Sequence, residues 1–535
     1  MDRMRSVRRW LTTAVLLVWA ATVLPPLAAA TWFDSPDQLR LQAERLEKQG
    51  RWSEARKAWE QILQKNRGLR DVRDHYLFCL RRAQLSLRHA DTSYRQQVQS
   101  LSLQDALQVY GEILSRLKAE YVDHEKVEFP LLFKQGLDEL LLALSDPTFR
   151  RLHLRGVDAK LVQAFAEQLQ TQWANPTIRR QEEAQTLAKS VAFAANQQLG
   201  LSPALVVLEL ACGACSSLDE YTYYLTPAQF NDQNAAWKGE LIGIGIDVTV
   251  DSRKQLAICQ VIPGSPAQVE SLKTGDRVLR INGRTTANLS ADAATELLKG
   301  NLDTTVKLEV LSVGDQRSRT LVLRRQLIHV PSVSMPRILE MGVGYLQLVS
   351  FQETTPAELD DAILKLQMAG MKVLVLDLRG NAGGLFEEAR QVVERFLSSG
   401  IIVSTQGQVT EFNATYSAHG VNPLAVPLVV LVDAETASCA EMVAGAIKDN
   451  LRGRLVGKTT FGKGSIQKVR KLNTVPPSAI RMTVAKFYSP RGQPYDGFGV
   501  SPHQDVAGSE PGLDPEQDPQ IQAALEVART LALGR

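Results

Sequence analysis

The sequence predicts a multidomain α+β fold, because three regions with different patterns of apolar residues follow one another along the chain. Residues 35–198 carry apolar side chains three and four positions apart, the spacing of helices that bury one face. Residues 238–325 consist of short β-rich runs, and residues 337–505 alternate continuous apolar strands with helical stretches. A chain of 535 residues is also too long for one core, since domains mostly contain roughly 100–200 residues.

The overall composition is that of a soluble globular protein. Hydrophobic residues make up 44% of the chain and charged residues 22%. The 61 basic and 58 acidic side chains leave a net charge of only +3. This balance gives no electrostatic reason to expect a nucleic-acid partner or a charged membrane surface.

Residues 1–30 have the three parts of a secretory signal peptide. The apolar run from Trp10 to Leu24 is shorter than the roughly 20 residues that span a bilayer. Ala28 and Ala30 supply the small side chains that a signal peptidase needs. The charged part before the run contains Arg3, Arg5, Arg8 and Arg9. We therefore expect export to the bacterial periplasm or cell envelope, with membrane attachment only through an uncleaved signal.

Residues 31–100 form a predicted helical hairpin region that resembles a single tetratricopeptide repeat. Fewer than three such units follow, so the hairpin has to bury its apolar face on neighbouring helices. A binding surface for protein partners is the alternative. Residues 101–237 are predicted to be a further helical region that leads into the later domains. The residues that fit the hairpin are Ala43, Leu46, Gly50, Trp52, Ala55, Ala58, Trp59 and Ile62.

The five cysteines do not indicate a disulfide framework, because an odd number cannot all pair within one chain. Cys212 and Cys215 have the spacing of a small metal or disulfide pair, but no second pair and no histidine cluster stands near them. We expect both to be small buried residues.

Residues 238–328 resemble a PDZ domain over the whole module. The turn Pro263–Ala267, the pair Gly275-Asp276 and the strand ending in Asn282-Gly283 all occur in the family's order. One departure, Glu270-Ser271-Leu272, affects packing more than the binding site. The resemblance implies that a peptide adds to the domain as an extra strand. Its C-terminal carboxylate would bind the backbone amides of Gly243, Ile244, Gly245 and Ile246.

Two segments of residues 337–505 carry groups suited to catalysis. Ser438 lies between a buried strand that ends at Val432 and a helix, so it should stand at a helix N-terminus, where free amides and the helix dipole stabilise an anion. Taken alone, such a serine is more often a helix cap. Lys463 is flanked by two glycines, and burial would be needed to make it a neutral base.

The two segments together resemble the carboxy-terminal processing (tail-specific) serine proteases, in both order and spacing. Thr436-Ala437-Ser438 and Thr460-Phe461-Gly462-Lys463 match that family's motifs, and 25 residues separate Ser438 from Lys463, as in the family. The resemblance implies a crotonase-like α/β protease core over residues 337–505. It assigns Ser438 as the nucleophile, Lys463 as the general base and Gln467 as the residue that holds the lysine in position.

The resemblance also implies how a tetrahedral intermediate is stabilised. The glycine-rich loop 377–384 would supply one oxyanion amide, from Gly384, and Cys439 would supply the other. Gln467 would share a face with Lys463 if that segment were helical. No metal or cofactor is needed, and residues 506–535 are expected to be a tail loop and a closing helix.

We therefore expect a serine endopeptidase that cleaves exported polypeptides near accessible C-termini, guided by its PDZ domain. The alternative is a catalytically silent PDZ and helical scaffold in the cell envelope. The presence of Ser438, Lys463 and Gln467 argues against that alternative.

Overall fold

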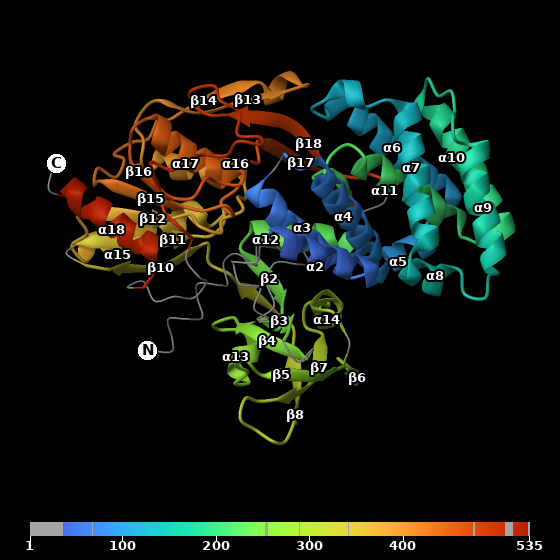
Figure 1. Ribbon diagram of the computed structural model, residues 1–535, viewed down its shortest axis with the longest axis horizontal. Coiled ribbons are helices and arrows are strands. Elements are labelled where there is room, and N and C mark those ends of the chain that lie inside the picture. Colours follow the sequence, from blue (N-terminus) through green and yellow to red (C-terminus); the bar gives the residue numbers. More distant parts are fainter. Residues whose placement is uncertain are drawn as a thin grey trace.

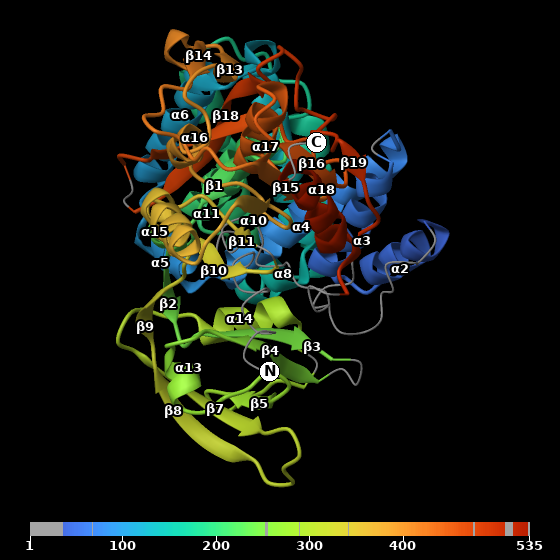
Figure 2. The same ribbon diagram turned by 90° about the vertical axis from the view of Figure 1, so that its left-hand side faces the viewer.

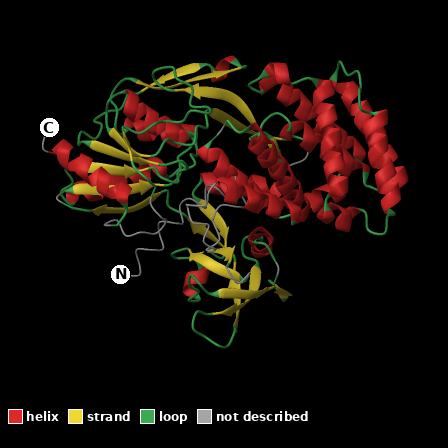
Figure 3. Cartoon of the chain, viewed as in Figure 1, coloured by secondary structure: helices red, strands yellow, loops and turns green. Residues whose placement is uncertain are grey.

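The computed structural model describes residues 36–66, 68–251, 255–287, 289–340, 342–474, 477–508 and 517–532. The predicted signal peptide lies outside these residues. Figure 1 shows a helical region on the right, an α/β core on the left and a smaller β-rich module below. Figure 3 shows a region of helices on the right and a mixture of strands and helices on the left. The multidomain α+β fold is thereby confirmed.

The first helices form a small core of their own. Helix α2 (Pro36–Lys48) turns at Gly50 into α3 (Trp52–Lys65), and both pack with α4 (Arg70–Ala90). The third helix supplies the partner that the hairpin needs to bury its apolar face. The buried residues of this core are Leu39, Ala43, Leu46, Ala55, Ala58, Trp59, Ile62, Val72, Tyr76 and Cys79.

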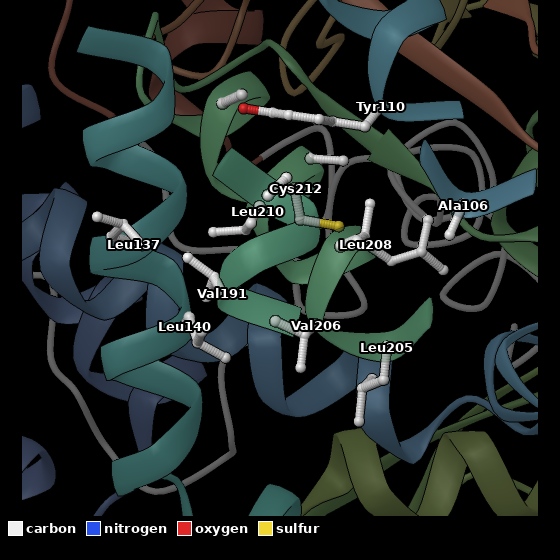
Figure 4. Close-up of a cluster of buried hydrophobic side chains, with 14 of the residues drawn as sticks. Ala106, Tyr110, Leu137, Leu140, Val191, Leu205, Val206, Leu208, Leu210 and Cys212 are labelled. Carbon is white, nitrogen blue, oxygen red and sulfur yellow. The ribbon is translucent and has the colours of Figure 1, made fainter. Parts of the chain in front are cut away.

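Helix α11 (Pro203–Ser216) is the centre of the larger helical region. Every residue from Ala204 to Cys215 is buried, and a helix that is buried on all sides is stable only when neighbours surround it. Figure 4 shows its side chains meeting those of the helices around it. Cys212 and Cys215 lie here as buried free thiols, as expected. The other helices are α5 (Thr92–Ser100), α6 (Leu103–Glu120), α7 (Phe129–Ser145), α8 (Pro147–His153), α9 (Ala159–Gln172) and α10 (Gln181–Leu199).

The β-rich module contains a sheet with the strand order β3, β4, β5, β7, β8. Strand β3 is therefore an edge strand, and α14 (Ala291–Leu298) packs beside it. The strands β2 and β9 pair with each other and connect the module to the rest of the chain (Figure 2). The strands are β2 (Glu240–Gly243), β3 (Ile246–Val250), β4 (Leu256–Val261), β5 (Arg277–Ile281), β6 (Arg284–Thr285), β7 (Thr305–Leu311), β8 (Arg319–Arg324) and β9 (Gln326–His329), with the short helix α13 (Pro266–Val269).

The α/β core is built on a sheet with the order β10, β11, β12, β15, β16, β19, parallel except for the first pair. Alternate residues of each strand point to opposite faces, so both faces bury apolar side chains. Helices α15, α16 and α17 cover one face and α18 covers the other. The strands are β10 (Val333–Ile338), β11 (Val343–Leu348), β12 (Val373–Asp377), β15 (Leu428–Val432), β16 (Arg454–Gly457) and β19 (Gln504–Asp505), and the helices are α15 (Thr355–Met368), α16 (Phe386–Glu394), α17 (Cys439–Asp449) and α18 (Pro519–Ala532).

A second sheet joins the core to the helical region. Its order is β1, β18, β13, β14, and β17 also pairs with β18. The long strand β18 (Ala479–Tyr488) packs its apolar face against the helical core around α11. Strand β1 (Tyr223–Leu225) leads directly from that helical region into the sheet. The remaining strands are β13 (Ile401–Gly407), β14 (Ala414–Ser417) and β17 (Ser465–Lys471). Within the described ranges, no helix combines the length and apolar character needed to cross a bilayer.

The close crossing of α7 and α11 gives a stability prediction. A methyl group on Gly136 would lie 2.7 Å from the carbonyl oxygen of Leu210, which belongs to the opposing backbone and cannot move aside. We expect Gly136→Ala to lower the free energy of unfolding by about 1–3 kcal/mol, measured by urea titration.

The matched control is Gly111→Ala in α6. A methyl group there would meet only the flexible ends of Gln181 and Gln185, at 2.5 Å. Because alanine favours helix over glycine by about 1 kcal/mol, this variant should be neutral or stabilising. If both variants were destabilised equally, the close approach of α7 and α11 at Gly136 could not be the cause of the loss.

Candidate active site

Ser438 stands at the sharp turn between β15 and α17, as the strand-turn-helix pattern predicts. It is buried, and its backbone has φ 59° and ψ −122°. A non-glycine residue seldom adopts a positive φ, and such strain gathers at functional sites. The Asp433 carboxylate holds the turn by accepting the N–H groups of Glu435 at 3.0 Å and Thr436 at 2.9 Å.

The glycine-rich loop after β12 lies against this turn. The Asn381 carbonyl accepts the N–H of Ala437 at 2.8 Å, and the Asn381 side chain accepts the N–H of Gly383 at 2.8 Å. A methyl group on Gly383 would stand 2.9 Å from Ser438 Cβ, so only glycine fits this approach. The structure thus brings together two segments that the sequence separates by more than fifty residues.

The two amides expected to bind an oxyanion are both available in this arrangement. In the described part of the chain, the N–H groups of Gly384 and Cys439 donate no hydrogen bond. Gly384 has φ 149° and lies so close to Phe351 that a side chain could not be accommodated. The Cys439 amide is the first of helix α17, where the dipole favours a negative charge. Burial raises the pKa of the Cys439 thiol to about 11.

Lys463 lies just before β17 and is buried. Burial lowers the pKa of its ammonium group to about 7, and the positive charge of Arg481 contributes in the same direction. The charges of Cys439, Glu220 and Glu441 oppose this shift and do not overcome it. The Lys463 Nζ atom lies 4.9 Å from the centre of the Tyr221 ring.

The Glu441 carboxylate joins the two segments that carry Ser438 and Lys463. One oxygen accepts the N–H groups of both residues, each at 2.8 Å. The other accepts the N–H of Gly462 and the hydroxyl of Thr460, each at 2.5 Å. Glu441 is fully buried, and burial raises the pKa of its carboxyl group while these hydrogen bonds lower it. One carboxylate therefore fixes both segments in a single geometry.

Gln467 does not lie on a helix with Lys463, because residues 465–471 form strand β17. The condition for a shared helical face with Lys463 is therefore not met, since the chain pairs here with β18. Gln467 donates to Ser465 at 2.9 Å and to Thr483 at 3.3 Å, and it accepts from Arg481 at 3.3 Å. Its predicted role in positioning the lysine stays a prediction.

The predicted peptide-binding loop connects β2 to β3. The carbonyl of Ile244 accepts the N–H of Ala267 at 2.9 Å, and the carbonyl of Gly245 accepts the N–H of Ile262 at 2.8 Å. The amides of Ile244 and Gly245 donate to none of the described residues. Gly243 and Ile246, the other two predicted residues, end β2 and begin β3. The loop is thus held by its carbonyls, with amides left for a ligand.

Sequence reasoning did not identify the roles of Glu441, Tyr221 and Arg481. Glu441 had a local signal, because a glutamate three residues after a helix-capping serine can reach back to the cap. Tyr221 and Arg481 had no such local signal. Tyr221 lies just before β1, and Arg481 lies on β18, the strand that pairs with β1, so both come from parts of the chain distant from Lys463. Among the described residues, no group of three or more histidine, cysteine or acidic side chains could hold a metal ion.

Two family models match this chain. Residues 342–506 match peptidase family S41, and residues 233–311 match the PDZ domain. A carboxyl-terminal-processing protease of Synechocystis sp. is 35% identical over 324 residues, which are 58% of this chain and 74% of the relative.

The chain belongs to the carboxyl-terminal-processing protease family. It is therefore a serine-type peptidase with a PDZ domain. The chloroplastic C-terminal processing peptidase of Tetradesmus obliquus is 34% identical over 56% of this chain and 66% of the relative. A photosystem II D1 C-terminal processing protease of known structure is 25% identical, with a TM-score of 0.42, over 80% of this chain and 97% of that chain.

Substitution of Glu441 tests its bridging role. All four partners of Glu441 donate hydrogen bonds, so Glu441→Gln would place an NH₂ group against two donors. We expect the free energy of unfolding to fall by roughly 1–3 kcal/mol for each donor left unpaired, and peptidase activity to fall with it. Thermal unfolding and peptide hydrolysis measure the two effects.

Glu387→Gln is the matched control, because Glu387 lies exposed on α16 and, among the described residues, its carboxylate pairs with Arg390 alone. An exposed ion pair contributes about 1 kcal/mol at most. If Glu441→Gln behaved like Glu387→Gln, the bridging role would be wrong.

Proposed function

We propose that the protease works through a Ser438–Lys463 dyad. The Ser438 hydroxyl oxygen forms a bond to the scissile carbonyl carbon while neutral Lys463 takes its proton. The tetrahedral intermediate then collapses, the C–N bond breaks, and Lys463 returns the proton to the leaving amine. Water hydrolyses the acyl-enzyme by the reverse sequence of proton transfers.

The observation that carries this proposal is a buried lysine whose pKa is about 7, fixed through one carboxylate to the serine segment. An ordinary lysine is protonated at neutral pH and cannot act as a base. A lysine with a pKa near 7 is neutral in about half of the molecules at that pH, as general-base catalysis requires.

The oxyanion would be bound by the amides of Gly384 and Cys439. Both belong to rigid segments, one beside Phe351 and the other at the start of α17. Donors that are fixed before the reaction stabilise the developing charge without reorganisation. Gln467, through its hydrogen bond from Arg481, would act from the second sheet to keep this side of the site in place.

The substrates we propose are polypeptides with accessible C-termini. The open edge of β3, with α14 beside it, is suited to add a peptide as an extra strand. The amides of Ile244 and Gly245 would hold the terminal carboxylate. With the signal peptide predicted at residues 1–30, these substrates would be exported proteins of the periplasm or cell envelope.

The experiment that tests the dyad compares wild-type protein with Ser438→Ala and Lys463→Ala on an unfolded polypeptide. Each variant should lose several powers of ten in rate while keeping its melting temperature, because a missing nucleophile or base removes the chemical step. Gln467→Ala, the control next to the site, should lose less. Normal turnover by Ser438→Ala or Lys463→Ala would contradict the dyad, and an inactive wild-type protein would favour the silent scaffold.

Recognition of the C-terminus gives a separate prediction. A peptide ending in a small or apolar residue should be cleaved with a higher kcat/KM as the free acid than as the amide, because amidation removes the charge that the loop amides favour. Equal rates on the wild-type enzyme would show that the PDZ domain does not read the terminus.

The variant for this test is Gly243→Leu. An added Cβ at Gly243 meets only the nitrogen of Gly245, at 3.9 Å, so the module should still fold. Gly245 is unsuitable, because its Cβ would lie 2.1 Å from Ser265 Cβ. Gly243→Leu should remove the difference between acid and amide, whereas Val322→Leu, at an exposed position on the opposite edge strand, should retain it.

A further inference from the structure

The C-terminal part of the chain contacts the glycine-rich loop through hydrogen bonds from Arg379. This residue follows β12 and directly precedes the glycine-rich part of the loop. Its guanidinium is nearly buried and donates to Asp377 at 2.7 Å and 2.9 Å. It also donates to Asp518 at 2.9 Å and to Gln520 at 3.0 Å. The last two partners lie about 140 residues further along the chain, at the start of α18.

The two carboxylate oxygens of Asp518 accept hydrogen bonds from different partners. One oxygen accepts the N–H groups of Gln520 at 3.0 Å and Ile521 at 3.2 Å, which caps helix α18. The other accepts Arg379. The carboxylate is only 1% exposed, so water screens this pair little.

Helix α18 is itself fixed to the core. Ile521, Ala524, Leu525 and Ala528 are buried against the face of the sheet that α15 to α17 leave open. Figure 1 shows α18 lying along β12 and β15. Strand β12 leads into the glycine-rich loop, and β15 leads into the Ser438 turn. The helix thus provides a rigid anchor for the Arg379 side chain.

Arg379 also lies at the start of the glycine-rich loop, beside the turn that leads to Ser438. The next residue, Gly380, donates its N–H to the Asp433 carboxylate at 3.0 Å, and Asp433 holds the turn before Ser438. The Asp377 carboxylate is fixed from the other side by the Tyr345 hydroxyl at 2.8 Å. A shift of the guanidinium would therefore be passed to the loop that carries Gly384.

We propose that Asp518 is a positioning residue of the protease, which holds the oxyanion loop in its catalytic shape through Arg379. Peptidase family S41 matches residues 342–506, so this contribution comes from a part of the chain beyond the matched core. The inference rests on the proposed function, because it assigns the effect to oxyanion binding at Ser438.

Asp518→Asn separates this role from helix capping. Asparagine caps a helix about as well as aspartate, so α18 should stay docked while the charge toward Arg379 is lost. Arg379 keeps Asp377 as its counter-charge, so no buried charge is left alone. The matched control is Arg529→Gln, which removes the Arg529–Glu340 ion pair of the same helix far from the loop.

The test measures kcat, KM and the affinity of a peptide boronate, which forms a tetrahedral adduct with an active serine. For Asp518→Asn in the full chain we expect kcat to fall about 10- to 100-fold with KM changed less than about twofold. The affinity for the boronate should fall by the same factor. Peptide binding to the Ser438→Ala, Asp518→Asn double variant should match that of Ser438→Ala alone, and Arg529→Gln should behave as wild type.

An unchanged kcat for Asp518→Asn would overturn the inference. So would parallel losses of kcat and melting temperature in Asp518→Asn and Arg529→Gln, which would mean that Asp518 only docks the helix. A wild-type enzyme whose activity did not depend on Ser438 would contradict the proposed function itself, and with it the inference.

Discussion

The buried carboxylate of Glu441 is the interaction on which the active site depends. Ser438 begins a helix on one sheet and Lys463 precedes a strand of another, and nothing in their local structure requires the two to meet. Four hydrogen bonds converge on Glu441 from the segments around both residues. Without this carboxylate, four buried donors would lose their acceptor, and a buried unpaired donor costs about 1–3 kcal/mol. The positions of the proposed nucleophile, Ser438, and of the proposed base, Lys463, are therefore fixed by the same carboxylate.

The two sheets contribute different groups around the Glu441 bridge. In the proposed mechanism the parallel sheet would stabilise the oxyanion, through the Ser438 turn, the loop around Asn381 and the first amide of α17. The second sheet would supply the base, where Tyr221 and Arg481 lie next to Lys463. Burial lowers the pKa of the lysine, and the nearby positive charge of Arg481 adds to this shift. The helical region packs on β18 and so supports the base side from outside.

Local patterns predicted much of the fold and part of the site. The apolar run of β15 followed by a helix placed Ser438 at a helix start, and the order of β-rich runs marked the PDZ domain. The glycines around Lys463 indicated close packing. The structure explains this for Gly464, because a Cβ added there would lie 2.4 Å from the backbone nitrogen of Asp496. The local spacing could not decide whether Gln467 lies on a helix, and pairing with β18 makes its segment a strand. Tyr221 and Asp518 reach the site only through contacts between distant parts of the chain, which periodicity and short motifs do not encode.

The ionisation of Lys463 is the most direct test of the proposed dyad. The ¹³Cε chemical shift of Lys463 can be followed by NMR from pH 5 to 11 in protein with ¹³C-labelled lysine, with the signal assigned by its loss in Lys463→Ala. The account predicts a midpoint near pH 7, and a higher midpoint in Arg481→Gln, since removal of a neighbouring positive charge makes protonation easier. A Lys463 midpoint near 10.4, the value of a free lysine, would contradict the account, because the residue would then be protonated when the enzyme works.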